Sequence, residues 1–420
     1  PLLGHFAGKE VCTAMKQVSG GVCAAKGFVA AGVHCGVKAG SSPDKNDLAL
    51  ILSERECAAA AVYTLNRVKS APVYVTMDHL EDGTAWGVVA NSGNANACCP
   101  LSHENAQAMC AAAAQATGRQ PEDFVVASTG VIGKTINIGV IQAGMPKAAA
   151  ALGRDGSDSA ANAIMTTDTA KKEIAISFEL GGKEVRMGAI AKGSGMIHPN
   201  MGTMLAFITT DCAITHELLS DALHQVAART FNRVTVDGDT STNDTCAVLA
   251  NGLAGNTLIE WKDGDYEIFV AALDHVCRYL ARSIAADGEG CTKLITCLMS
   301  GARSEESAER LAKSVVGSSL VKAAMFGADA NWGRVLCAMG YSKAPFRPEH
   351  VDVTFRSAAG ELLVCKQGEA VDFDEAKAKE VLSQKEVIIA VDLHEGEDSA
   401  ECWGCDLTYD YVKINGDYRT

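Results

Sequence analysis

The stretch Lys192-Gly-Ser-Gly-Met-Ile-His-Pro-Asn-Met-Gly-Thr-Met-Leu-Ala-Phe-Ile208 decides how this 420-residue chain is interpreted. A glycine-rich loop containing a proline leads to Gly202, then to Thr203, then to an apolar run typical of a buried strand. Because Gly202 has no Cβ, its carbonyl is unshielded and its backbone can adopt angles that other residues avoid. The stretch therefore favours a self-cleaving bond, in which the Thr203 hydroxyl attacks the preceding carbonyl and water then releases a new chain.

Cleavage would leave a hydroxyl and a free α-amine on the same residue, Thr203. An α-amine titrates near about pH 8, so it can serve as the base that activates its own hydroxyl. Before cleavage the same nitrogen is an amide and accepts no proton. Taken alone, however, a Gly-Thr pair before an apolar run is more often a plain loop that enters a sheet.

Several long strings, in one order along nearly the whole chain, resemble the ornithine acetyltransferase family of glutamate N-acetyltransferases in arginine biosynthesis. The string HPNMGTMLAFITTD (198–211) is similar to the cleavage and nucleophile segment of that family. The family usually has alanine where this chain has Gly202, and because both residues are small the chemistry should survive. The other matching strings are GVHCGVKAG (32–40), NSGNAN (91–96), ASTGVIG (127–133), MTTDT (165–169), TFNRVTVDGDTSTNDT (230–245), DGEG (287–290), FGADANWGR (326–334) and VKINGDYRT (412–420).

The resemblance implies functional roles for several residues that the local sequence alone would assign to turns, helix caps or solvent-exposed positions. It makes Thr129 and Gly130 the oxyanion hole, where sequence alone favours a turn. It also implies six substrate ligands: Thr166, Lys192, Thr203, Glu289, Asn415 and Thr420. From sequence alone, Thr166 would be part of a turn or a helix cap, Lys192 a solvated lysine and Glu289 a carboxylate in a surface turn. Asn415 and Thr420 would belong to a free tail. Thr167 is nearly as defensible a ligand as its neighbour.

The last residues of the chain would be disordered by default, but the resemblance implies that they fold back and bind substrate. Val412 and Ile414 alternate with Lys413 and Asn415, which predicts a short strand there. His198, next to Pro199, assists cleavage or shapes the loop.

The family resemblance implies a ping-pong reaction that uses no coenzyme. N-acetylornithine acetylates Thr203, ornithine leaves, and glutamate departs with the acetyl group; some members also use acetyl-CoA. Fragments 1–202 and 203–420 are expected to stay associated, as an α2β2 heterotetramer in the cytoplasm. One rival is a related self-processed aminopeptidase or amidohydrolase, which would pass its acyl group to water. The other is a non-catalytic, cysteine-rich metal or redox protein.

Composition narrows the choice of partners. The net charge is −14, and no block of five Lys or Arg occurs, which disfavours nucleic acid and anionic membranes. We see neither an apolar run of about 18 residues nor a signal peptide. The 16 cysteines are scattered, and only Cys402 and Cys405 have ligand spacing, so free thiols without metal are expected. Four carboxylates at cation-like spacing are judged structural: Asp237, Asp239, Asp244 and Asp329.

The order of elements indicates a layered α+β fold. The family resemblance adds an N-terminal-nucleophile-like architecture with sheets sandwiched by helices. A smaller C-terminal subdomain is expected at about 342–400. Apolar periodicity predicts helices at 104–117, 218–230, 266–286 and 304–322, and strands at 86–90, 124–128, 205–210, 351–355 and 387–393.

Overall fold

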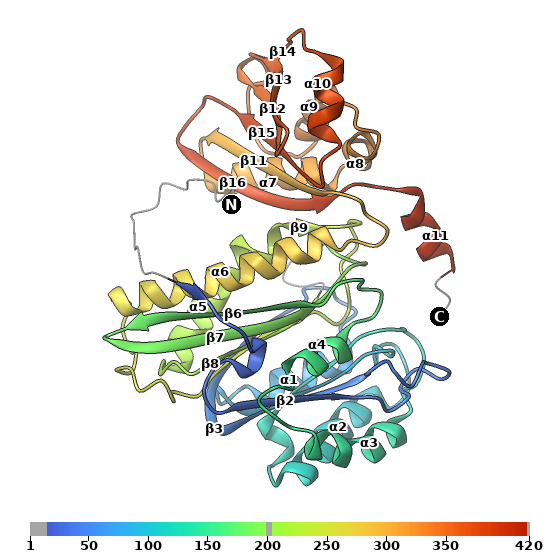
Figure 1. The fold of residues 1–420 in the computed structure, drawn as a ribbon, viewed down its shortest axis with the longest axis vertical. Helices are drawn as coiled ribbons and strands as arrows, with labels where there is room; N and C mark the ends of the chain where they lie inside the picture. The colour runs from blue at the N-terminus through green and yellow to red at the C-terminus, as the bar shows by residue number, and fades with distance from the viewer. Residues whose placement is uncertain (1–14, 199–203, 418–420) are drawn as a thin grey trace.

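The computed structural model describes residues 15–198 and 204–417. Within these ranges the chain forms two sheets, each covered by helices (Figure 1). In the larger sheet the strand order is β1-β6-β7-β8-β10-β3-β4-β5, with β2 paired to β3. Its strands are β1 (Lys16–Gln17), β2 (Phe28–Val33), β3 (Leu48–Tyr63), β4 (Thr84–Asn91), β5 (Phe124–Ser128), β6 (Lys172–Leu180), β7 (Lys183–Lys192), β8 (Leu205–Thr210) and β10 (Thr245–Ala250).

Strand β8 lies inside the larger sheet. It pairs antiparallel with β7, where Lys192 faces Leu205, and parallel with β10, where Leu205 faces Thr245. Every residue of β8 is buried, as its continuous apolar run predicts for a strand covered on both faces. The sheet is therefore built from strands on both sides of residues 199–203.

Helices cover both faces of the larger sheet. Two of them, α5 (His216–Arg229) and α6 (Gly264–Ala286), share one apolar core with β6, β7 and β8. Asp263 caps the start of α6 by accepting a hydrogen bond from the Tyr266 N–H. On the other face of β8, Leu205 and Phe207 share a second core with α4 (Ser157–Ile164). A third core, on the face of β3, β4 and β5 that points away from α4, contains α1 (Ala71–His79), α2 (Ser102–Thr117) and α3 (Ile138–Ala150). Figure 1 shows α6 lying between the two sheets, and it contacts β9, β11 and β16 of the second sheet.

The second sheet has the strand order β14-β13-β12-β15-β11-β16-β9. Its strands are β9 (Val234–Thr235), β11 (Leu294–Ala302), β12 (Asp352–Ser357), β13 (Gly360–Lys366), β14 (Glu369–Ala370), β15 (Glu386–Asp392) and β16 (Asp398–Cys405). It has an apolar core of its own with four helices, α7 (Glu305–Gly317), α8 (Ser319–Phe326), α9 (Trp332–Gly340) and α10 (Glu375–Leu382). Residues 342–400 supply β12–β15 and α10 to this unit.

The layered α+β class is confirmed, and β5 and β8 have the predicted bounds. The single helix predicted at 304–322 is wrong, because the chain is extended at Ser318 and starts a new helix there. The Ser318 hydroxyl accepts a hydrogen bond from the Val321 N–H, which is the local signature of a helix start.

The strand predicted at 412–415 is also wrong, because Tyr409–Asp417 form a helix, α11. Thr408 accepts a hydrogen bond from the Tyr411 N–H at 3.4 Å, as a capping threonine does. Val412 is 69% exposed, so the alternation of apolar and polar residues does not mark a buried sheet face.

Candidate active site

A cavity of about 150 Å³ opens where β5, β7 and β8 meet the loops around them. It is lined by every predicted oxyanion and substrate residue that the structure describes: Thr129, Gly130, Thr166, Lys192, Glu289 and Asn415. Met204, which follows Thr203 in the chain, also lines it. Gly202, Thr203 and Thr420 lie outside the described residues. Residues from five distant parts of the sequence thus converge beside Met204, which follows the predicted nucleophile in the chain.

The turn after β5 is held by a second loop, residues 91–97. The Thr129 N–H donates to the Asn91 carbonyl at 3.0 Å, and the Ala95 N–H donates to the Val131 carbonyl at 2.9 Å. Asn243 joins the two loops, since its side-chain amide donates to the carbonyls of Ala95 and Ser128. The Thr129 amide is therefore occupied, so the groups of this turn that can face an oxyanion are the Thr129 hydroxyl and the Gly130 N–H.

Gly130 is required at this turn. Its φ is +132°, a region that side chains rarely adopt, and a Cβ would lie 2.4 Å from the Gly93 carbonyl carbon. The close approach of the two loops thus depends on a residue without a side chain. This fixes the direction of the Gly130 amide before any ligand arrives, which is what an oxyanion donor needs.

Lys192 ends β7 and is buried, contrary to the solvated lysine that its sequence context alone suggests. Its positive charge acts on Asp168. Burial alone would raise the pKa of Asp168, but Lys192 and Lys172 outweigh burial and hold that pKa at about 2. Asp168 is therefore ionised at neutral pH.

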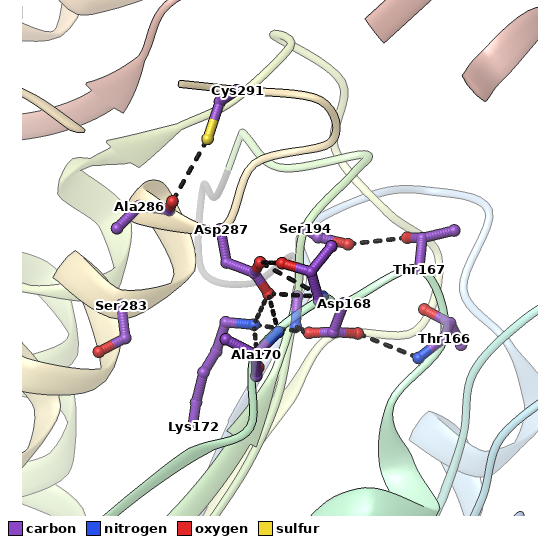
Figure 2. Close-up of polar contacts among 12 residues, drawn as sticks. Thr166, Thr167, Asp168, Ala170, Lys172, Ser194, Ser283, Ala286, Asp287 and Cys291 are labelled. Carbon is purple, nitrogen blue, oxygen red and sulfur yellow. Dashed lines mark hydrogen bonds and ion pairs between the residues drawn. The ribbon is translucent and has the colours of Figure 1, made fainter. Parts of the chain in front are cut away.

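A buried ion network joins Asp168, Lys172 and Asp287 (Figure 2). The Lys172 ammonium lies 2.8 Å from Asp168 Oδ1 and 2.6 Å from Asp287 Oδ2. Asp168 accepts from the N–H groups of Thr166 and Gly193 at 3.0 and 2.7 Å. Asp287 accepts from the N–H groups of Thr169 and Ala170. Three buried charges thereby fix the backbone next to Thr166, Lys192 and Glu289.

Thr166 and Thr167 both line the cavity but differ in their contacts. The Thr167 hydroxyl is hydrogen-bonded to the Ser194 hydroxyl at 2.7 Å, as Figure 2 shows. The Thr166 backbone is held by Asp168 and Lys45, while no hydrogen bond to a described residue engages its hydroxyl. Thr166 is therefore the better placed of the two to bind a ligand.

Glu289 and Asn415 meet across the mouth of the cavity. The Asn415 side-chain amide donates to Glu289 Oε2 at 2.8 Å, so helix α11 returns the end of the chain to the site. The Glu289 N–H donates to the Ser194 carbonyl at 2.9 Å. A Cβ on Gly195 would lie 2.3 Å from the Glu289 carboxyl carbon, so Gly195 makes room for that carboxylate.

The remaining sequence candidates shape the surroundings of the cavity. Asp237 accepts from the N–H groups of Met196 and Ile197 at 2.6 and 2.8 Å, which fixes the loop before residue 199. His198 contacts the Thr235 hydroxyl at 2.9 Å, and its carbonyl accepts from the Thr240 hydroxyl. Burial, then the charge of Lys313, lowers the pKa of His198 to about 4, so its ring is neutral at pH 7.

The Cys402–Cys405 spacing has a structural explanation. Both residues lie on β16, where residues three apart point to opposite faces. Cys402 packs into the core of the second sheet and Cys405 into the core around α6. Within residues 15–198 and 204–417, no three His, Cys, Asp or Glu side chains gather as a metal site requires. Over the same part of the chain, no helix is long and apolar enough to cross a bilayer.

Sequence reasoning did not find the residues that hold the site in shape. Asp168 and Asp287 lie inside strings that match the family, but only the fold shows that one lysine joins them. Lys172 opens β6 as one of two adjacent lysines, and nothing in its spacing distinguishes it from a solvated residue. Asn243 likewise has no local signal.

Comparisons with known proteins show which family this chain is related to. The ArgJ family model matches residues 29–420. The arginine biosynthesis bifunctional protein ArgJ of Symbiobacterium thermophilum is 53% identical over 97% of this chain and 100% of its own length. The protein of the same name from Caldanaerobacter subterraneus subsp. tengcongensis is 48% identical, with the same shares of both chains covered. A crystal structure of ArgJ from Bacillus halodurans is 47% identical, covers 51% of this chain and 100% of that chain, and has a TM-score of 0.49. This chain belongs to the ArgJ family.

Proposed function

We propose that this protein is a glutamate N-acetyltransferase that cuts itself between Gly202 and Thr203 and then transfers acetyl groups through Thr203. N-acetylornithine is the donor, glutamate is the acceptor, and acetyl-CoA is a second donor. The observation that carries the proposal is the convergence of Thr129, Gly130, Lys192 and Glu289 on one cavity beside Met204. Membership of the ArgJ family, whose relatives named above are bifunctional, supports it.

Each group in the cavity has a task that suits its chemistry. Lys192 offers a buried cation to the α-carboxylate that N-acetylornithine and glutamate share. Glu289 accepts from a substrate amine, and Asn415 orients it through the 2.8 Å hydrogen bond. The Thr166 hydroxyl adds a further polar contact. Two substrates with the same amino-acid core can therefore use one site in turn.

The reaction follows from a hydroxyl and an amine on one residue. The Thr203 amine takes the proton of its own hydroxyl, whose oxygen attacks the acetyl carbonyl. The Thr129 hydroxyl and the Gly130 N–H stabilise the oxyanion, ornithine leaves with the proton, and an acetyl ester remains on Thr203. The glutamate amine then attacks that ester. Water must be excluded meanwhile, or the ester would hydrolyse.

The two fragments, 1–202 and 203–420, remain together after the cut in this proposal. Support comes from β8, which lies between β7 of the first fragment and β10 of the second. An α2β2 assembly is proposed as well, and light scattering would test it. A cytoplasmic location is supported by the free thiols of the cysteines in the described part of the chain.

Intact mass and a denaturing gel test the cut, and labelled acetyl tests the transfer. We expect two fragments that meet at Gly202 and Thr203, and labelled N-acetylglutamate from N-acetylornithine and glutamate. The Thr203→Ala variant should stay one chain of full mass and be inactive. Release of free acetate in place of N-acetylglutamate would favour the hydrolase alternative. A Thr203→Ala protein that still yields both fragments would refute cleavage by this hydroxyl.

A further inference from the structure

A second and larger cavity, of about 530 Å³, adjoins the first. The described residues that line it come from α7, from the end of α9, from the segment after β7 and from the connection between β9 and β10: His198, Thr240, Arg310, Lys313, Ser314, Gly317, Tyr341 and Ser342. No part of the mechanism above uses them.

The two cavities share a thin wall. Ile197 and Thr240 form a β-bridge, and the Thr240 hydroxyl donates to the His198 carbonyl at 2.8 Å. Thr240 lines the second cavity, while the next residue, Ser241, lines the first. Met196 lines the first cavity and His198 the second. A ligand in the second cavity therefore lies one pair of backbone segments away from the acyl-transfer site.

The lining of the second cavity suits an anion. Arg310 and Lys313 are three residues apart on α7 and so share one face of that helix. No carboxylate is among its described lining residues, although the chain as a whole carries a net charge of −14. Glu306 lies 3.8 Å from Arg310, but it is 82% exposed, so this pair is weak.

The Lys313 ammonium is held in place, because it donates to the Asn232 carbonyl at 2.7 Å. Burial lowers the pKa of Lys313, and a bound anion would favour its charged form. His198 adds no charge at pH 7. The positive charge of the cavity thus comes from one fixed ammonium and one guanidinium, whose planar fork matches phosphate oxygens.

The volume of the second cavity and the aromatic ring that lines it indicate which class of anionic ligand it binds. Sites for ligands of nucleotide or drug size are usually about 300–1,000 Å³, so the second cavity is large enough and the first is not. Tyr341 lines it with a ring that is largely open to solvent, which offers a face on which a base can stack. Phosphates, a base and proximity to the acyl site together describe a nucleotide-linked acyl donor.

We propose that the second cavity binds the phosphorylated nucleotide part of acetyl-CoA, while the pantetheine arm carries the thioester to the first cavity. This rests on the proposed function. In the transfer step the Thr203 oxygen bonds to the thioester carbonyl carbon, the carbon–sulfur bond breaks, and the hydroxyl proton leaves on the thiol of CoA. The acetyl ester so formed is the one that N-acetylornithine also produces.

The test compares donors that do and do not carry the nucleotide. The Arg310→Glu variant should lower the preference for acetyl-CoA over S-acetylpantetheine, measured as a ratio of kcat/KM values, by roughly tenfold or more. Arg310→Gln should lower it less. Lys379→Glu, a charge reversal at an exposed position of α10, should keep the wild-type ratio. Calorimetry with CoA alone should show weaker binding to Arg310→Glu than to the wild type.

The outcomes separate the two proposals. A wild type that moves no acetyl group from N-acetylornithine to glutamate would refute the proposed function. A wild type that does so, but binds no CoA, would overturn the second-cavity site and leave the function standing. A wild-type preference for acetyl-CoA over S-acetylpantetheine in both Arg310 variants would likewise overturn the second-cavity site.

Discussion

Asp168 and Lys172 form an ion pair with almost no exposure to solvent. Asp168 Oδ1 and Lys172 Nζ are 2.8 Å apart, and their side chains are 0% and 1% exposed. Because Asp287 also pairs with this ammonium, the cluster holds two carboxylates on one lysine. A pair this deeply buried is costly to break from one side, since the remaining charge then has no partner.

Acid should weaken the fold through Asp168. Its pKa in the folded protein, about 2, lies below the ordinary carboxyl value near 3.8. A depressed pKa contributes stability above the unfolded value, and that contribution is lost as the pH falls toward 2; it amounts to roughly 2 kcal/mol. In a Thr203→Ala background, which keeps one chain, Asp168→Asn should lower the apparent Tm at pH 7.

The difference in Tm between that variant and its parent should then shrink as the pH is lowered from 5 to 3. Asp44→Asn, which removes an exposed carboxylate, is the control and should follow the parent throughout. A gap between Asp168→Asn and the parent that stays constant with pH would show that the charge of Asp168 is not what stabilises the site.

Thr129→Ala should separate turnover from affinity. In the proposed mechanism this hydroxyl stabilises charge that develops in the transition state, so its removal should lower kcat about a hundredfold, or about 3 kcal/mol. The KM for N-acetylornithine should change little. Thr129→Ser keeps the hydroxyl and should retain most of the rate. A rise in KM alone would mean that Thr129 binds ground-state substrate and that the oxyanion donors lie elsewhere.

Gly195→Ala should displace Glu289. The new Cβ would lie 2.3 Å from the Glu289 carboxyl carbon, and the flexible side chain is what must give way. Because the hydrogen bond to Asn415 would be lost or lengthened, we expect a KM for glutamate roughly tenfold higher. Steady-state kinetics measure it. Gly264→Ala is the control, since nothing lies within 4 Å of a Cβ there; equal behaviour of the two variants would contradict the prediction.

Deleting residues 415–420 should leave cleavage intact and abolish acetyl transfer. In the proposed cleavage the hydroxyl of Thr203 is the nucleophile and the tail takes no part, whereas Asn415 donates a direct hydrogen bond to Glu289. Intact mass reports the first effect and labelled N-acetylglutamate the second. Asn415→Ala should lose part of the activity, while Lys413→Ala, at an exposed position on the same helix, should lose none. A truncated protein that is cleaved and fully active would show that the tail has no part in the reaction.

Elements with a strong local signal could be predicted from the sequence. Strands β5 and β8 are continuous apolar runs, and their bounds were predicted correctly. Strand β3 was not predicted, because Ser53-Glu-Arg-Glu56 interrupts its apolar pattern where the pairing with β4 shifts register. The tail helix differs from the predicted strand because a pattern of four residues cannot distinguish the 3.6-residue period of a helix from the two-residue period of a strand.

The candidate site was predictable only as far as the family resemblance reached. Thr129, Lys192 and Glu289 do line one cavity, although their sequence contexts alone favour turns and solvent. The role of Lys172 could not be predicted, because it depends on an ion pair with Asp287, which is 115 residues further along the chain. A buried charge network is a property of tertiary packing, and no periodicity encodes it.

The position of β8 between β7 and β10 has a consequence for refolding of the protein after the proposed cut. The precursor folds as one chain, so β8 finds β7 by an intramolecular step whose entropy cost grows only slowly with loop length. After the cut proposed between Gly202 and Thr203, the same pairing would have to form between two separate fragments, and refolding would become concentration-dependent. The mature protein should therefore persist because it unfolds slowly, and once denatured at low concentration it should not return. The proposed self-cleavage would thus make recovery of the native structure depend on whether the chain is cut before or after it folds.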